Sequence, residues 1–147
     1  MTATKYQSCD YMKTKEFPFW IQRFHHDSSN IPPIHSHEFI ELVYVVKGHA
    51  KHLFEGQSYT IKTNDVFIIN PGEAHTFLIE KEQSLEIINC LFLPNLIQDS
   101  WLKELGVSQS MDYFYIHPFL DKNARCHHLL NLDGRYSIRF LHLLDVM

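Results

Sequence analysis

The chain has 147 residues, of which 45% are hydrophobic and 20% charged, so it has the composition of a folded protein and the length of one domain. Its net charge of −4 excludes a broadly basic surface of the kind that binds a phosphate backbone. The three cysteines are widely spaced and form no CxxC pair, which argues against a disulfide framework and against a cysteine zinc site.

The N-terminal 16 residues are polar, unpatterned and without the apolar core of a signal peptide. We expect residues 1–16 to form a flexible arm. From residue 17 to residue 93, short apolar runs alternate with Gly, Asn-Asp and Pro-Gly turns at the spacing of a β-sandwich or barrel. No apolar run reaches the roughly 18 residues of a membrane-spanning helix, so we expect a cytoplasmic protein without membrane contact.

Helical spacing of apolar residues begins only after Leu93. Residues 94–106 start at a proline and stop at a glycine, which predicts a short helix. Residues 137–147 predict an amphipathic helix, with Ile138, Leu141 and Leu144 on one stripe and further apolar residues beside it. A helix with so wide an apolar face must pack on the barrel, on a partner chain or on both. We therefore predict a barrel over 17–93 followed by a helical dimerisation and linker segment over 94–147.

Four residues have the pattern of a metal site: His35, His37, Glu41 and His75. Side chains alternate across a strand, so positions 35, 37 and 41 share one face, and a closed barrel brings a fourth ligand from another strand. Three imidazoles and one carboxylate suit a divalent metal such as zinc, nickel, manganese or iron, with one or two positions open. The same histidines are also compatible with a metal-free role as hydrogen-bonded interior residues.

The intervals between His35, His37, Glu41 and Gly48 resemble the first motif of the cupin superfamily, and residues 64–75 resemble the second. Asn64 and Asn70 stand where the second motif has glycine and proline, and asparagine tolerates the left-handed conformation that the glycine would adopt. The resemblance implies an all-β, cupin-type double-stranded β-helix, or jelly roll, with the C-terminal helices packed outside.

Residues 17–147 further resemble the sensor domain of AraC-type transcription regulators, in the segments HSHEFIELVYVVKG, NDVFIINPGEAHTF and NLDGRYSIRFLHLLDVM. This resemblance implies a small-molecule effector, often a sugar, inside the barrel and a homodimer formed through the C-terminal helices. It implies DNA contact only through a helix-turn-helix domain that is absent from this chain. By the same analogy residues 1–16 would cover the barrel mouth as a lid, with disorder as the equal alternative.

Trp20, Arg23 and Tyr44 are the candidate effector-binding residues, by aromatic stacking and by a polar group that orients the ligand, with ordinary packing as the alternative for each. On the strand that follows His37, Val43 and Val45 should face inward, while Leu42 and Tyr44 face outward beneath the C-terminal helices.

Two other functions remain open on the sequence. A metal-dependent cupin enzyme, a sugar isomerase or dioxygenase, would use the same four ligands, but the spacing places no further residue as a general base. A metal-free binding module is the third hypothesis, and it leaves the AraC-like tail unexplained.

Overall fold

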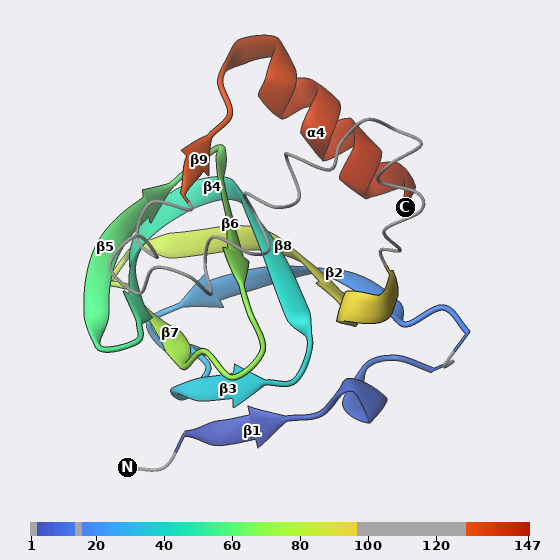
Figure 1. Cartoon of the computed structure of the whole chain (residues 1–147). Helices are drawn as coiled ribbons and strands as arrows, with labels where there is room; N and C mark the ends of the chain where they lie inside the picture. Colours follow the sequence, from blue (N-terminus) through green and yellow to red (C-terminus); the bar gives the residue numbers. More distant parts are fainter. Residues whose placement is uncertain (1–2, 14–15, 97–128) are drawn as a thin grey trace.

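The computed structural model describes residues 3–13, 16–96 and 129–147 (Figure 1). Nine strands in this part of the chain form one curled sheet, whose two layers share the long strand β4 (Ile40–Phe54). The first layer follows the order β2 (Phe19–Asp27), β8 (Ser84–Phe92), β4, β6 (Asp65–Ile69) and β9 (Leu130–Asn131). The second follows the order β1 (Thr4–Tyr6), β3 (His35–His37), β7 (His75–Leu78), β4 and β5 (Gln57–Lys62). The predicted all-β fold is confirmed.

Strand β4 serves both layers because it bends in the middle. Its first half pairs with β6 and β8, its second half with β5 and β7, and a β-bulge lies between Val45 and Lys47. Gly48, just after the bulge, has a φ of +96°. A Cβ atom at this position would lie 2.1 Å from the carbonyl oxygen of Ser84, so only glycine fits the bend.

The space between the layers holds the main hydrophobic core, which includes Val43, Val45, Ile61, Ile69 and Ile87. Leu42 and Tyr44 lie on the opposite face of β4, as strand alternation predicts. The inward and outward faces of this strand are therefore those that the sequence indicates.

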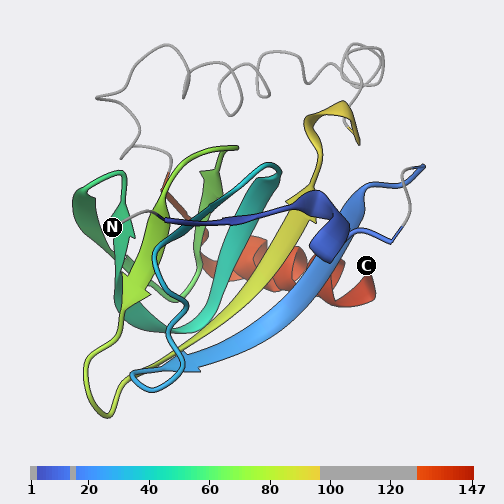
Figure 2. The same ribbon diagram turned by 90° about the horizontal axis from the view of Figure 1, so that it is seen from below.

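A helix at the C-terminus, α4 (Gly134–Val146), covers the outer face of the first layer (Figure 2). Leu144 is 7% exposed, and Phe140 and Leu141 lie partly buried beside it. Ile138 and Leu143 are 72% and 58% exposed, so the packed stripe differs from the predicted one and is centred on Leu144 and the turn before it.

Of the predicted helix over 94–106, the structure describes only the short 3-10 turn η2 (Pro94–Leu96), and the remainder lies outside the described residues. The described residues contain no helix of the length and apolar character needed to cross a membrane.

Residues 4–12 do not form the predicted free arm. β1 pairs in parallel with β3, and the short 3-10 helix η1 (Ser8–Asp10) is held because the backbone N–H and the hydroxyl of Ser8 both donate to Glu38, at 2.8 and 2.6 Å. Met12 is buried against Phe39 and neighbouring apolar residues. Edge pairing and these contacts outweigh the polar composition that favoured disorder.

Candidate functional site

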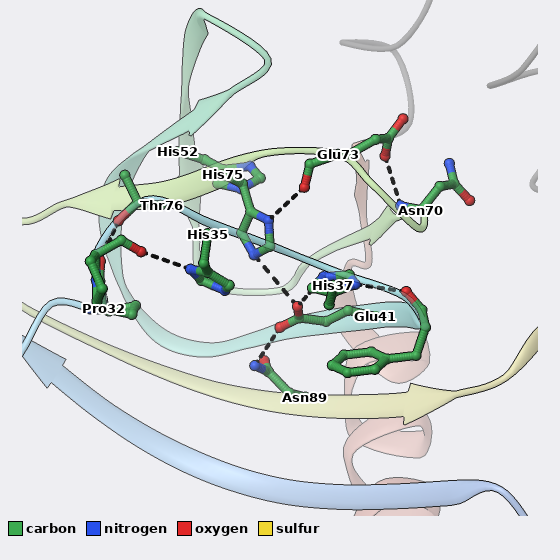
Figure 3. A network of polar contacts seen from close by, with 12 residues as sticks. Pro32, His35, His37, Glu41, His52, Asn70, Glu73, His75, Thr76 and Asn89 are labelled. Atoms are coloured by element: carbon green, nitrogen blue, oxygen red, sulfur yellow. Dashed lines mark hydrogen bonds and ion pairs between the residues drawn. The ribbon is translucent and has the colours of Figure 1, made fainter. Parts of the chain in front are cut away.

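The structure buries all four predicted metal ligands near one another (Figure 3), but only His35, Glu41 and His75 form a group whose ligand atoms could share one ion. His37 lies outside this group, beside Glu41. His35 and His37 come from β3, Glu41 from the start of β4 and His75 from the start of β7, directly opposite His35. The ligand atoms of His35, Glu41 and His75 all lie within 4.8 Å of one another. Glu41 Oε2 lies 2.9 Å from His37 Nε2 and 3.5 Å from His75 Nε2.

The turn before β7 positions His75. The backbone N–H of Asn70 donates to Glu73 Oε2 at 2.7 Å, a bond that the proline of the cupin motif could not make. At the other departure from that motif, Asn64 adopts a φ of +73°, so asparagine replaces glycine in the left-handed conformation as expected. Asn64 and Asn70 are therefore both compatible with the turns in which they lie.

Backbone carbonyls set the protonation of the three imidazoles. Each ring has Nδ1 beside a carbonyl oxygen: His35 beside Pro33 (2.8 Å), His37 beside Phe39 (2.7 Å) and His75 beside Glu73 (3.3 Å). A carbonyl oxygen only accepts, so Nδ1 carries the proton and Nε2 is the nitrogen left for a ligand. This is the arrangement by which proteins orient metal-binding histidines.

The charges of the cluster favour the binding of a cation. Burial and the neighbouring His75 lower the pKa of His35 to about 4, so this ring is neutral at pH 7. Burial alone would raise the pKa of Glu41, but hydrogen bonds from Nε2 of His37 and His75, which a ring donates when it carries a second proton, lower that pKa below its usual range. Either a second proton on a ring or a divalent cation would balance the lone pairs that converge here, so the residues fit a metal.

A cavity of about 210 Å³ opens beside the cluster. Its wall includes the four cluster residues, six further aromatic side chains and two polar ones: Tyr6, Tyr11, Trp20, Phe24, Phe39, Phe77, His26 and Asn89. Trp20, Phe24 and His26 come from alternate positions of β2. Aromatic walls with a few buried polar groups are typical of small-molecule sites.

Of the three predicted effector-binding residues, only Trp20 lines the cavity. Arg23 lies on the outer face, where its guanidinium contacts Glu86 Oε1 at 2.8 Å and Asp145 Oδ1 at 2.6 Å. Tyr44 is buried on the same face and packs edge-on against Phe140. Strand alternation is the reason, because odd positions of β2 and even positions of β4 face α4.

Sequence reasoning missed His26, Asn89 and the tyrosines of the N-terminal segment. His26 could have been predicted as a cavity residue, since it has the same parity as Trp20 on one strand. Asn89 gave no such signal. His52 is a core histidine behind His75 (Figure 3), with Nδ1 2.7 Å from the Tyr59 hydroxyl and a pKa that burial lowers to about 3.

The fold is of the cupin type. The structure is similar to a cupin protein from Bacteroides fragilis, with a TM-score of 0.50 and 13% identity over 54% of this chain and 70% of that chain. It is equally similar to the cupin domain of Schizosaccharomyces pombe Cnp3, with a TM-score of 0.50 and 13% identity over 65% of this chain and 67% of that chain. The predicted cupin-type fold is confirmed.

The chain belongs to the AraC-like ligand binding domain family, whose model matches residues 17–138. The HTH-type transcriptional activator RhaR of Pectobacterium carotovorum subsp. carotovorum (strain PC1) is 31% identical over 91 residues, which are 62% of this chain and 31% of the relative. RhaR of Yersinia pseudotuberculosis serotype O:1b (strain IP 31758) is 26% identical over 113 residues, 74% of this chain and 38% of the relative. The chain thus matches about a third of these relatives' length.

Proposed function

We propose that the cavity beside Glu41 is the effector site, and that this domain passes the binding signal to a helix-turn-helix domain in a longer chain. The observation that carries the proposal is the aromatic cavity with a buried polar cluster on its wall. The family match supports a bound ligand, and we propose that this ligand is a small molecule such as a sugar. The proposed role is that of a transcription regulator and not of an enzyme. A protein in this role acts in the cytoplasm.

A single layer of strands separates the cavity from α4. Trp20 faces the cavity and Ile21 faces the helix cluster, and the same holds for Asn89 and Ile88 on β8. An effector that prefers one arrangement of these strands shifts the population of α4 positions by its difference in affinity. This gives the signal a physical route out of the cavity.

Homodimerisation through α4 is part of the proposal. The helix carries several apolar side chains that are more than half exposed, namely Tyr136, Ile138, Leu143, Val146 and Met147. So many exposed apolar groups on one helix are typical of a surface that packs on a partner.

A divalent metal, zinc, nickel, manganese or iron, would be held by His35, His37, Glu41 and His75. When bound it would supply a positive charge that polarises an oxygen atom of the effector. Element analysis of purified protein should find one metal per chain, with loss in His37→Ala and retention in His25→Ala, whose ring is exposed on the outer side. Equal metal content in the two variants would remove the metal from the proposal.

The test of the effector site is a thermal-shift screen of neutral sugars, alditols and sugar acids, followed by calorimetry. We expect a compound that raises the melting temperature and binds wild type, binds Arg23→Ala with similar affinity and loses most affinity in Trp20→Ala. Arg23 is the matched control because it lies on the same strand but outside the cavity. Unchanged affinity in Trp20→Ala would place the effector elsewhere.

A metal-dependent enzyme is the second candidate, favoured by the histidine–glutamate cluster alone. It requires turnover of a bound sugar or of a sugar with oxygen, detectable by NMR, that disappears in His37→Ala. A ligand recovered unchanged from metal-loaded protein would support the regulator.

A further inference from the structure

We propose that Asn89 is the residue that selects the effector: its Oδ1 accepts a hydrogen bond from a hydroxyl group of a neutral, compact, polyhydroxylated ligand, while its amide nitrogen holds Glu41. The proposal rests on the cavity being the effector site, as proposed above. It assigns a ligand class and a specificity residue to that site.

The orientation of the Asn89 amide is fixed by its neighbour. Asn89 lies on β8 between Ile88 and Cys90, which pack in the cluster under α4, so its own side chain faces the cavity. Its Nδ2 donates to Glu41 Oε1 at 2.5 Å (Figure 3). Because Nδ2 is the donor in this hydrogen bond, the nitrogen end of the amide faces Glu41 and the oxygen end points away from it.

That oxygen is left without a partner. Asn89 Oδ1 is buried and makes no hydrogen bond within the part of the chain that the structure describes, and the same holds for His26 Nδ1. Both residues line the cavity. A buried polar atom without a partner is costly, and native proteins satisfy such atoms with a ligand or an ordered water. The two atoms therefore mark where the polar groups of a ligand belong.

The charge of the cavity narrows the ligand class. The lining of the cavity includes neither lysine nor arginine among the described residues. A carboxylate or phosphate ligand would find no cationic side chain there to pair with. An amide oxygen instead accepts from a hydroxyl group, and another hydroxyl group could hydrogen-bond the imidazole of His26. Trp20 and Tyr11 line the same cavity and offer apolar surface to the carbon atoms of a sugar ring.

The experiment is calorimetry with a panel of aldopentoses, aldohexoses and alditols, together with sugar acids of the same size. For the tightest neutral binder, each monodeoxy analogue is then measured. In wild type we expect one hydroxyl whose removal weakens binding about 10- to 100-fold. In Asn89→Leu the parent sugar should weaken by a similar factor, and the parent and that one deoxy analogue should bind alike. Loss of this discrimination is a readout that a merely structural role would not produce.

Asn70→Leu is the matched control, because Asn70 is also a buried asparagine with an unpartnered Oδ1 but does not line the cavity. It should keep the discrimination of wild type. Asn89→Thr keeps a hydroxyl that can donate to Glu41 and serves as the second variant if Asn89→Leu does not fold; it should lose the discrimination too.

Three results would overturn the inference. If folded Asn89→Leu or Asn89→Thr keeps the wild-type ratio between parent and deoxy sugar, Asn89 does not select the effector, although loss of binding in Trp20→Ala would still support the cavity. If only sugar acids bind wild type, the neutral class is wrong. If no member of the panel binds wild type, the polyhydroxylated class is wrong as well, and the cavity itself is then judged by Trp20→Ala with a ligand of another class.

Discussion

Gly48 lies where β4 passes from one layer of the sheet to the other, with a positive φ and the Ser84 carbonyl against its Cα. We expect Gly48→Ala to lower the free energy of unfolding by more than about 2 kcal/mol, because the added methyl group overlaps a backbone oxygen in a conformation that L residues avoid. Urea denaturation followed by circular dichroism measures the change.

Gly56→Ala is the control for this substitution. Gly56 also has a positive φ, but a Cβ there meets nothing within 4 Å. Gly56→Ala should lower the free energy of unfolding by about 1 kcal/mol, which is the cost of the left-handed backbone conformation alone. If the two variants lose the same amount, the close approach of Ser84 does not constrain the bend.

Cys90 and Cys9 differ in their surroundings, one buried under α4 and the other exposed. Burial raises the pKa of the Cys90 thiol to about 12, so almost no thiolate forms at pH 8. We expect a thiol reagent to label Cys9 in native protein within minutes and to label Cys90 only after unfolding. Peptide mass spectrometry reads each site separately, and rapid native labelling of Cys90 would contradict the packing of α4.

At this scale the sequence predicts well what depends on parity and motif spacing. His35, Glu41 and His75 meet, with His37 beside Glu41, because alternation and the two cupin motifs place them on one interior face. Arg23 and Tyr44 could have been excluded as effector ligands by the same alternation, since each shares a parity with outward-facing residues. Asn89 could not be predicted as a ligand-binding residue from the sequence, because its proposed role comes from the unpartnered oxygen and not from any pattern along the chain.

At the scale of elements, α4 shows which features of a helix an amphipathic pattern can predict. The pattern predicts a helix that covers the outer face of the barrel, and the structure has one. The predicted stripe was wrong at Ile138, which is exposed, because α4 carries apolar residues on more than one side and the contacts with β4 and β8 decide which of them pack. β1 was missed because three residues that pair with a sheet edge leave no periodic signal.

The packed stripe can be tested with neighbouring leucines. Leu144→Ala should lower the free energy of unfolding by about 2–4 kcal/mol, since it opens a cavity against Tyr44 and Ile88. Leu143→Ala, at an exposed position of the same helix, should change it by less than about 0.5 kcal/mol. Thermal and urea unfolding of both variants decide the point, and a reversed order would mean that α4 packs through its other face.

At the scale of the whole molecule, the exposed apolar groups of α4 bear on assembly. We expect this domain to sediment as a dimer and the double variant Ile138→Glu, Leu143→Glu to sediment as a monomer, because two carboxylates would be buried in the interface. Sedimentation velocity at several concentrations measures this. Lys62→Glu, a charge change on the exposed side of β5, is the control that should stay dimeric. Monomeric wild type at high concentration would rule out dimerisation of the isolated domain.

The sharing of β4 between both layers also bears on how the domain folds. β4 pairs with β5, β6, β7 and β8, and β2 joins the sheet only when Phe19 meets Phe92 and Asp27 meets Ser84. The paired residues of β2 and β8 are far apart in the sequence, so we expect this pairing to form slowly and after the local hairpins. The wall of the cavity includes residues of β2, β4 and β8. A partly folded chain in which β2 and β8 are unpaired therefore lacks the cavity. A small molecule in the cavity therefore binds only the finished domain, and it slows unfolding without helping the chain to fold.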